Sequence, residues 1–174
     1  MKKYELTDDK IEVAGITLCR IKRISDGVLG GYLESEDNLS HYEDAWVSGN
    51  AKVFGDARVR GKASVYGNAW VRGNARVYGD AWVRGNARVY GDAKVYGNAK
   101  VCGNTRVEKL SDVCNITNQA FNITITRQNI VIGCQSKTYA EWSKVTKKQA
   151  EEMGICVLKY RYIKKLVKLI WKNI

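Results

Sequence analysis

The 174-residue sequence lacks several features that mark membrane, secreted and metal-binding proteins. No segment reaches the roughly 18 to 20 apolar residues of a membrane span, and the opening MKKYELTDDK has no apolar run typical of a signal peptide. The five cysteines are odd in number, scattered and free of C-x-x-C spacing, so neither a disulfide framework nor a zinc site is indicated. We therefore expect a cytoplasmic protein with reduced thiols, no metal and no cofactor.

Proline is absent and 45% of the residues are hydrophobic, which is enough for one ordinary domain or a short repeat array with capping elements. The net charge of +11 is unevenly spread. Residues 1–44 carry 6 basic and 10 acidic side chains, residues 45–110 carry 12 and 4, and residues 111–174 carry 11 and 4. The excess of positive charge over residues 45–174 favours phosphate backbones, anionic membranes or acidic proteins as partners.

The middle of the chain repeats a six-residue phrase, A-x-V-x-G-(N/D), and two double copies stand at 69–92 as AWVRGNARVYGDAWVRGNARVYGD. In an extended A-x-V segment, Ala and Val face one side and the x residues face the other. Gly followed by Asn, Asp or Lys suits a sharp corner. Strands and corners at a fixed period predict a solenoid. Valine recurs at this period twelve times, at Val47, Val53, Val59, Val65, Val71, Val77, Val83, Val89, Val95, Val101, Val107 and Val113.

The pattern V-x-G-(N/D)-A-x resembles the hexapeptide repeat of left-handed parallel β-helices, in which three hexads close one triangular coil of 18 residues. The resemblance implies an all-β solenoid of about four coils, roughly 20 Å long at about 4.8 Å per strand spacing. The left-handed sense comes from the resemblance alone, because parallel crossovers are otherwise right-handed. We expect an N-terminal β cap over 1–44, the β-helix over 45–116, and a C-terminal β-hairpin with short helices over 117–174.

An 18-residue coil makes equivalent residues of successive coils neighbours. Asn50, Asn68, Asn86 and Asn104 then form a ladder at one corner, which we interpret as turn geometry. The outward residues fall on three faces. The first face holds Trp46, Ser48, Ser64, Tyr66, Trp82, Arg84, Lys100 and Cys102. The second face holds Lys52, Phe54, Trp70, Arg72, Arg88, Tyr90, Arg106 and Glu108. The third face holds Arg58, Arg60, Arg76, Tyr78, Lys94, Tyr96, Asp112 and Cys114.

The two ends carry further patterns. Residues 4–24 predict short strands around Asp8-Asp9 and Ala14-Gly15, and FNITITRQNIVIGC at 121–134 predicts a hairpin. Thr138 with Glu141, and Thr146 with Gln149, indicate capping boxes of two short helices. The tail 158–174 predicts an amphipathic helix with Ile163 and Val167 on its apolar stripe, docked on the solenoid or on a partner subunit, with a membrane surface as the other reading.

Two further segments resemble uncharacterised bacterial and phage hexapeptide-repeat proteins. GVLGGYLESEDNLSHYEDAWVSGNA at 27–51 is similar to their lead-in, and IGCQSKTYAEW at 132–142 is similar to an element that ends many of the phage-encoded ones. The resemblance implies a phage or prophage origin and brings no assigned activity.

Catalytic residues of the related enzymes are scarce here. Hexapeptide-repeat acyltransferases generally use a histidine base, and the carbonic anhydrases of this fold hold zinc with three histidines. The only histidine is His41, beside Glu43 and Asp44, so the three-histidine zinc site is excluded. Cys102 and Cys114 face outward in the coil scheme without a nearby histidine. An acyltransferase-like enzyme using His41 remains the alternative, which acetyl-CoA protection in a thermal-shift assay would favour.

The outward faces therefore predict a non-enzymatic binding scaffold, a dimer or trimer. Rows of Arg and Lys between Tyr and Trp suit nucleic acid, because phosphates are neutralised and exposed bases are stacked. The partner is nucleic acid or a nucleic-acid-handling host protein, and inhibition of a host nuclease-based defence is the specific version. A purely structural phage component is a third reading. The expected binding residues are Arg58, Arg60, Trp70, Arg72, Arg76, Tyr78, Arg88, Tyr90, Lys94 and Tyr96, and the expected oligomer or partner contacts are Trp46, Tyr66, Trp82 and Trp171.

Overall fold

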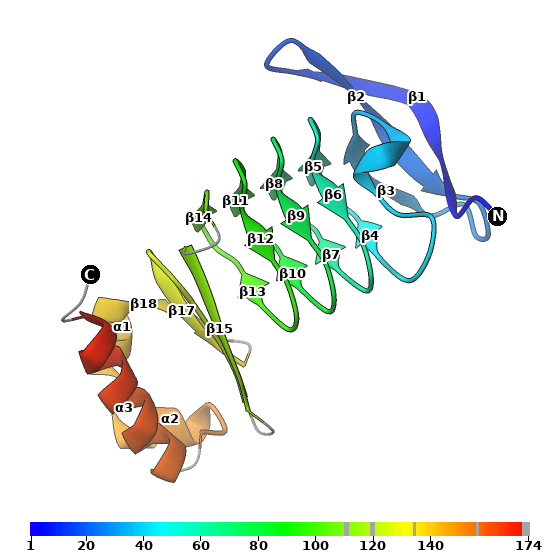
Figure 1. Cartoon of the computed structure of the whole chain (residues 1–174). Helices are drawn as coiled ribbons and strands as arrows, with labels where there is room; N and C mark the ends of the chain where they lie inside the picture. Colours follow the sequence, from blue (N-terminus) through cyan, green and yellow to red (C-terminus); the bar gives the residue numbers. More distant parts are fainter. Residues whose placement is uncertain (110–111, 119–120, 134, 156, 172–174) are drawn as a thin grey trace.

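The computed structural model describes residues 1–109, 112–118, 121–133, 135–155 and 157–171, with the side chains of these residues except 114–118, 121–122, 157–159, 166 and 170–171. A solenoid of short parallel strands forms the middle of the molecule, between an N-terminal β-hairpin and a C-terminal sheet that carries helices (Figure 1). The solenoid strands are β4 (Trp46–Val47), β5 (Lys52–Val53), β6 (Arg58–Val59), β7 (Ser64–Val65), β8 (Trp70–Val71), β9 (Arg76–Val77), β10 (Trp82–Val83), β11 (Arg88–Val89), β12 (Lys94–Val95), β13 (Lys100–Val101) and β14 (Arg106–Val107).

Each solenoid strand lies parallel to the strand one coil further along. Arg58 pairs with Arg76 and Arg76 with Lys94, which is the eighteen-residue register expected from the repeats. The strands stack as β4-β7-β10-β13, β5-β8-β11-β14 and β6-β9-β12, and these three stacks carry the first, second and third faces in turn. The structure thus confirms the fold class predicted from the sequence, a β-solenoid of about four stacked coils with a C-terminal hairpin and short helices.

The core of the solenoid is a ladder of small aliphatic side chains. Val59 and Ala57 in one coil, like Val77 and Ala75 in the next, are fully buried. Burial of a valine side chain contributes about 1.5 to 3 kcal/mol, so the stability of the array comes mainly from this repeated contact. The ladder also explains the small residue in each hexad, because the interior of a triangular coil has no room for a second large side chain.

The corners need glycine for two reasons, and Gly61 shows both. Its φ of +73° lies in the left-handed region, and a Cβ atom there would stand 2.9 Å from the backbone nitrogen of Gly79 in the next coil. The asparagine corner forms the predicted ladder. The Nδ2 atoms of Asn50 and Asn68 each donate to the Oδ1 of the asparagine one coil further along at 3.4 Å, and Asn86 donates to Asn104 at 3.1 Å.

The N-terminal cap consists of β1 (Tyr4–Val13), β2 (Ile16–Arg23) and β3 (Leu29–Leu33), followed by the 3-10 turn Glu36–Asn38. The hairpin turns at Ala14 and Gly15, which both have positive φ, as predicted. Asp8 and Asp9 do not separate two strands, because β1 runs through them with a shift of register between Leu6 and Lys10. β3 pairs in parallel with β5, so the cap extends the sheet that carries the second face.

The cap also covers part of that face. Phe54, expected on the outer surface, is only 5% exposed because it packs with Leu18 of the hairpin and Tyr32 of β3. Phe54, Leu18 and Tyr32 therefore form a small second core over the first coil of the second face. The repeat pattern alone does not predict this core.

The C-terminal sheet is antiparallel and contains β15 (Val113–Asn118), β16 (Phe121–Thr126), β17 (Asn129–Ile132) and β18 (Gln135–Thr138). The expected hairpin of 121–132 is present as β16 and β17. Val113, which continues the six-residue period, lies in β15 opposite Thr126 rather than in a parallel coil.

Three described helices follow: α1 (Tyr139–Lys144), α2 (Lys147–Glu152) and α3 (Val157–Trp171). Both predicted capping boxes are present, since Thr138 accepts from the Glu141 amide and Thr146 from the Gln149 amide. None of the helices in the described ranges is long and apolar enough to cross a bilayer.

Docking of the tail helix on the solenoid was one prediction, but the buried side chains described for α3 do not belong to the solenoid core. Its Ile163 and Val167 are buried against Trp142 of α1 and Ile130 of β17, in a core separate from that of the solenoid. The indole Nε1 of Trp142 donates to the Ile130 carbonyl at 2.8 Å. The described part of the apolar stripe thus packs on the C-terminal sheet and α1, which supply an apolar surface close by in sequence.

Asp112 joins the solenoid to the C-terminal sheet. Its Oδ2 accepts from the amides of Glu108 and Lys109 at 2.9 and 3.0 Å, and its Oδ1 lies 2.9 Å from the Nε of Arg127. Burial raises the pKa of this carboxyl, but the two amide donors and Arg127 outweigh it, so the pKa lies below the ordinary value of 3.8. Asp112 is therefore buried at this junction and does not continue the third face as the coil scheme expected.

Candidate nucleic-acid interface

The first face is largely occupied by contacts within the chain. Trp46 is half-buried, with the Arg23 guanidinium 4.5 Å from its ring centroid and the Tyr4 ring in a T-shaped contact at 6.4 Å between centroids. Trp82 stays 41% exposed, although Tyr66 meets it edge-on at 6.2 Å. Of the residues predicted to contact a partner, Trp82 offers the largest open ring, and the expected oligomer stays a prediction. The side chain of Trp171, the remaining one, lies outside the described residues.

At the far end of this face, the C-terminal sheet covers the fourth coil. The Lys100 amide donates to Thr124 Oγ1 at 2.9 Å, and the Lys100 ammonium donates to the Gly133 carbonyl at 2.9 Å. Cys102, expected to face outward, is consequently buried with 4% exposure. Its thiol is therefore not available as a surface nucleophile, and Cys114 lies outside the residues whose side chains are described.

Three cations of the second face lie over rings, whereas Arg106 of the fourth coil has no ring contact among the described residues and lies beside Arg88. Trp70 lies between two cations from the coils before and after it, with Lys52 Nζ at 5.7 Å and Arg88 Cζ at 5.3 Å from the ring centroid. Arg72 Cζ lies 5.2 Å from the centroid of Tyr90. Burial lowers the pKa of the Lys52 ammonium. Each such pair is worth roughly 0.5 to 1 kcal/mol at an exposed site, so this face stabilises the solenoid itself.

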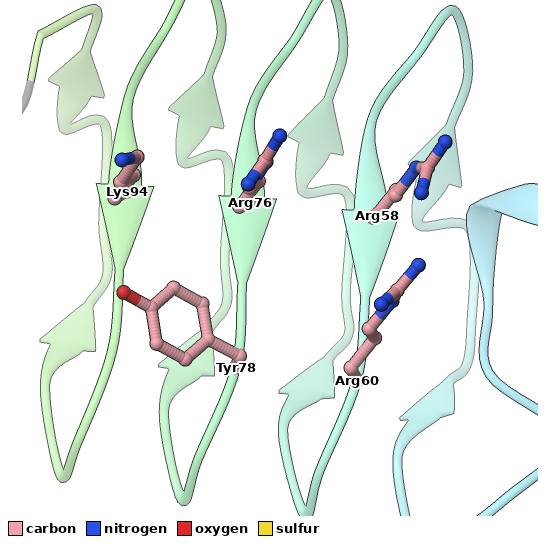
Figure 2. Close-up of a pocket in the computed structure, with 5 residues that line it drawn as sticks. All are labelled: Arg58, Arg60, Arg76, Tyr78 and Lys94. Atoms are coloured by element: carbon pink, nitrogen blue, oxygen red, sulfur yellow. The ribbon is translucent and has the colours of Figure 1, made fainter.

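The third face has a different arrangement. Arg58, Arg76 and Lys94 form an unbroken row of cations along the solenoid on β6, β9 and β12, as Figure 2 shows. All three side chains are exposed. Within the described part of the chain, none of them has a carboxylate within 4.0 Å, a side-chain hydrogen bond or a ring contact. The row is therefore a set of exposed positive charges without a direct ion pair, although Asp56 and Asp92 line a hollow beside it.

A second row lies beside the cations, two residues further along each strand, and contains Arg60, Tyr78 and Tyr96. The rings of Tyr78 and Tyr96 stack on each other with centroids 5.5 Å apart and planes 13° from parallel. They remain 38% and 47% exposed. Arg60 is exposed as well, and its guanidinium has no ring or carboxylate contact among the described residues.

The two rows enclose a shallow hollow of about 340 Å³, lined by Arg58, Arg60, Arg76, Tyr78 and Lys94 (Figure 2). On the other side of the cation row lies a more polar hollow of about 480 Å³, where Asp56, Asn74 and Asp92 form the corner. Asn74 Nδ2 donates to Asp92 Oδ1 at 3.0 Å, so this carboxylate is held by an amide rather than by a cation. The arrangement can accept anionic groups over the first hollow, where no carboxylate lines the wall.

His41 lies in the N-terminal cap and not on any of the three faces. Its ring stacks on Tyr4 with centroids 4.2 Å apart, Nδ1 accepts from the Lys3 amide at 3.2 Å, and Nε2 lies 3.3 Å from Glu36. The carboxylate beside the histidine is thus Glu36 rather than the neighbouring Glu43 or Asp44. Both ring nitrogens have partners in this structure, which fits a side chain that holds the cap together.

The predicted binding residues separate into two groups. One group lines the hollow of the third face and contains Arg58, Arg60, Arg76, Tyr78 and Lys94, with Tyr96 stacked on Tyr78. The other group lies on the sheet of the second face, where its cations lie over its rings, and contains Trp70, Arg72, Arg88 and Tyr90. The covering of Phe54 and the Arg23–Trp46 pair were not predicted, because both depend on how the cap folds back. No group of three His, Cys, Asp or Glu side chains that could hold a metal occurs among the described residues.

Comparison with known proteins adds no assignment. No protein-family model matches the chain, and no curated protein matches it. The likeness of its motifs to bacterial and phage hexapeptide-repeat proteins stays an interpretation of those motifs, and the function is argued from the geometry of the faces.

Proposed function

We propose that this protein is a non-enzymatic binding scaffold that holds nucleic acid on the third face of its solenoid. The observation that carries the proposal is the unpaired row of Arg58, Arg76 and Lys94. Equal charges on adjacent strands of a sheet destabilise it. At a separation of about 5 Å in water, each such contact costs on the order of 1 kcal/mol. The repulsion within the row lowers the stability of the fold, and a bound polyanion would offset this repulsion.

The geometry suits a linear polyanion. Successive cations are separated by one coil, about 4.8 Å, and stand in a straight line. Phosphates of one strand in a duplex advance by about 3.4 Å along the axis, and a strand pulled out of the duplex form is more extended. Arginine forks bind phosphate through two parallel hydrogen bonds, and lysine binds it as a point charge. The row can therefore follow a short stretch of a sugar-phosphate backbone.

Catalysis is not part of the proposal, because His41 stacks on Tyr4 and lies beside Glu36. The acyltransferase alternative is tested by acetyl-CoA in a thermal-shift assay, where a clear rise in melting temperature would support it against the scaffold. On the motif resemblance alone we also propose a phage or prophage origin. In that setting, binding of nucleic acid or of a host protein that handles it would interfere with a nuclease-based defence.

The proposal is tested by charge reversal on two matched faces. Replacement of Arg58, Arg76 and Lys94 together by Glu should lower the affinity for labelled oligonucleotides by on the order of a hundredfold or more, because bonds to charged groups are worth about 1.5 to 3 kcal/mol each. The control replaces Arg72, Arg88 and Arg106 of the second face by Glu, with the same change in net charge. Equal affinities of the two variants, or no binding by the wild type, would refute the proposal.

A protein partner is the other outcome of this test. If the wild type binds no oligonucleotide but captures a host protein from lysate after nuclease treatment, and the third-face variant does not, the surface recognises an acidic protein and the nucleic-acid function is wrong. Circular dichroism spectra of both variants should match that of the wild type, which shows that the coils are intact.

A further inference from the structure

The hollow on the third face contains a candidate stacking surface, because Figure 2 shows the Tyr78 ring nearly face-on, with one ring face turned outwards from the sheet. The Tyr96 ring stacks beside it from the next coil, with centroids 5.5 Å apart and planes 13° from parallel. Figure 2 shows the Tyr78 ring leaning towards the coil of Lys94 and away from Arg60, so Arg60 does not cover the outward ring face. The contact with Tyr96 holds the Tyr78 ring at the side of the hollow and leaves the hollow unfilled.

The other walls of the hollow supply cations, which a nucleotide needs for its phosphate in addition to a ring for its base. The guanidinium of Arg60 is planar and stacks on flat π-systems, and in this structure no ring or carboxylate of the described residues occupies it. Arg58 and Arg76 stand in the neighbouring row, two residues back along their strands, which is about 6.6 Å at the usual rise per residue. A base stacked on Tyr78 would thus have these two cations at the distance of its own backbone.

We propose that the third face selects unpaired bases, with one base stacked on the outward ring face of Tyr78 while Arg58 and Arg76 hold its phosphate. This inference rests on the proposed function and narrows its ligand from nucleic acid in general to single strands. In a duplex the base faces are already covered by their neighbours, and only phosphates reach the row of cations. A single strand adds base stacking, and alanine substitution of a stacking ring lowers affinity by about 5- to 150-fold per base.

Tyr90 on the second face shows that the stacking site is not a general property of the repeat. It occupies the equivalent position of its hexad, but Arg72 lies over its ring at 5.2 Å, so a base would first have to displace an intramolecular partner. Tyr90 is therefore the matched control for Tyr78, with the same residue type and the same place in the strand.

The experiment measures fluorescence-anisotropy affinities for three probes: a labelled homopolymeric single strand, a duplex of the same length, and inorganic polyphosphate as competitor. The wild type should bind the single strand more tightly than the duplex. Tyr78→Ala should weaken single-strand binding about tenfold while the inhibition constant of polyphosphate changes less than about twofold. Tyr78→Phe, which keeps the ring, and Tyr90→Ala should both bind as the wild type does.

The other outcomes separate this inference from the proposed function. If no probe binds, the proposed function is wrong and the inference fails with it. If the duplex binds as tightly as the single strand, or if Tyr78→Ala weakens polyphosphate and single strand equally, nucleic-acid binding stands and the stacking site is refuted. A loss on Tyr78→Phe that equals the loss on Tyr78→Ala would also refute it, because the hydroxyl rather than the ring would then carry the effect.

Discussion

The second and third faces are built from the same kinds of residue and behave differently. On the second face, Trp70 stands in one row between Lys52 and Arg88, so both of these cations meet a ring in the adjacent coil, and only Arg106 at the end of the row follows a cation. On the third face, Arg58, Arg76 and Lys94 form one row without a ring, and Tyr78 and Tyr96 stack on each other in the other row, after Arg60. Composition alone does not separate a stabilising face from a binding face. The order of residues at eighteen-residue spacing decides which charges are paired and which are left for a ligand.

The largest expected difference in stability between the faces comes from removing a ring. Trp70→Ala should lower the free energy of unfolding by about 2 to 3 kcal/mol, somewhat less than the loss of a fully buried aromatic, because Trp70 is half-buried against Phe54 and two cations. Tyr78→Ala should cost less than about 1 kcal/mol, since its ring contacts mainly Tyr96. Urea denaturation measures both, and equal losses would remove the distinction between the faces.

The junction at Asp112 predicts a dependence of stability on pH that the third face does not share. Its folded-state pKa is lowered, so the carboxylate contributes stability that is present above its unfolded value of about 3.8 and is lost as pH falls through the folded pKa. Asp112→Asn should cost about 1 to 2 kcal/mol at neutral pH and flatten the acid limb of the stability curve. Denaturation between pH 7 and pH 3 tests this, and an acid limb unchanged in the variant would contradict the assignment.

A single charge gives the smallest and most specific contrast. Arg76→Gln should reduce the slope of log affinity against log salt concentration for single strands by about 0.7, the value for one phosphate contact. The same variant should leave stability unchanged or raise it by a few tenths of a kcal/mol, because a repulsion within the row is removed. Arg88→Gln should leave the slope unchanged and lower stability by about 0.5 to 1 kcal/mol, because Trp70 loses a partner. Reversed results would exchange the roles of the two faces.

The sequence was sufficient for the solenoid and for the membership of its faces, because the constraints are local and periodic. Val and Ala at fixed spacing define the interior, and the register then brings Arg58, Arg76 and Lys94 together without any knowledge of the rest of the chain.

What the sequence could not supply depends on how the two ends fold back. The burial of Phe54 needs the position of Leu18, and the burial of Cys102 needs the C-terminal sheet. Pairing of rings was equally out of reach, since whether Tyr78 turns towards Tyr96 or towards Arg60 is a choice of rotamer and not of sequence spacing. The tail helix was predicted as a helix, but its partner was not, because an apolar stripe does not specify the surface it covers.

Mapping of a photo-crosslink tests the central claim most directly. A single strand that carries 4-thiouridine, irradiated in complex with the wild type and analysed by tandem mass spectrometry, should attach to Tyr78 in the tryptic peptide 77–84. Competition with inorganic polyphosphate should reduce the yield of the adduct. Attachment to Trp70 or Tyr90 instead, with Tyr78 unmodified, would place the ligand on the second face and contradict the account.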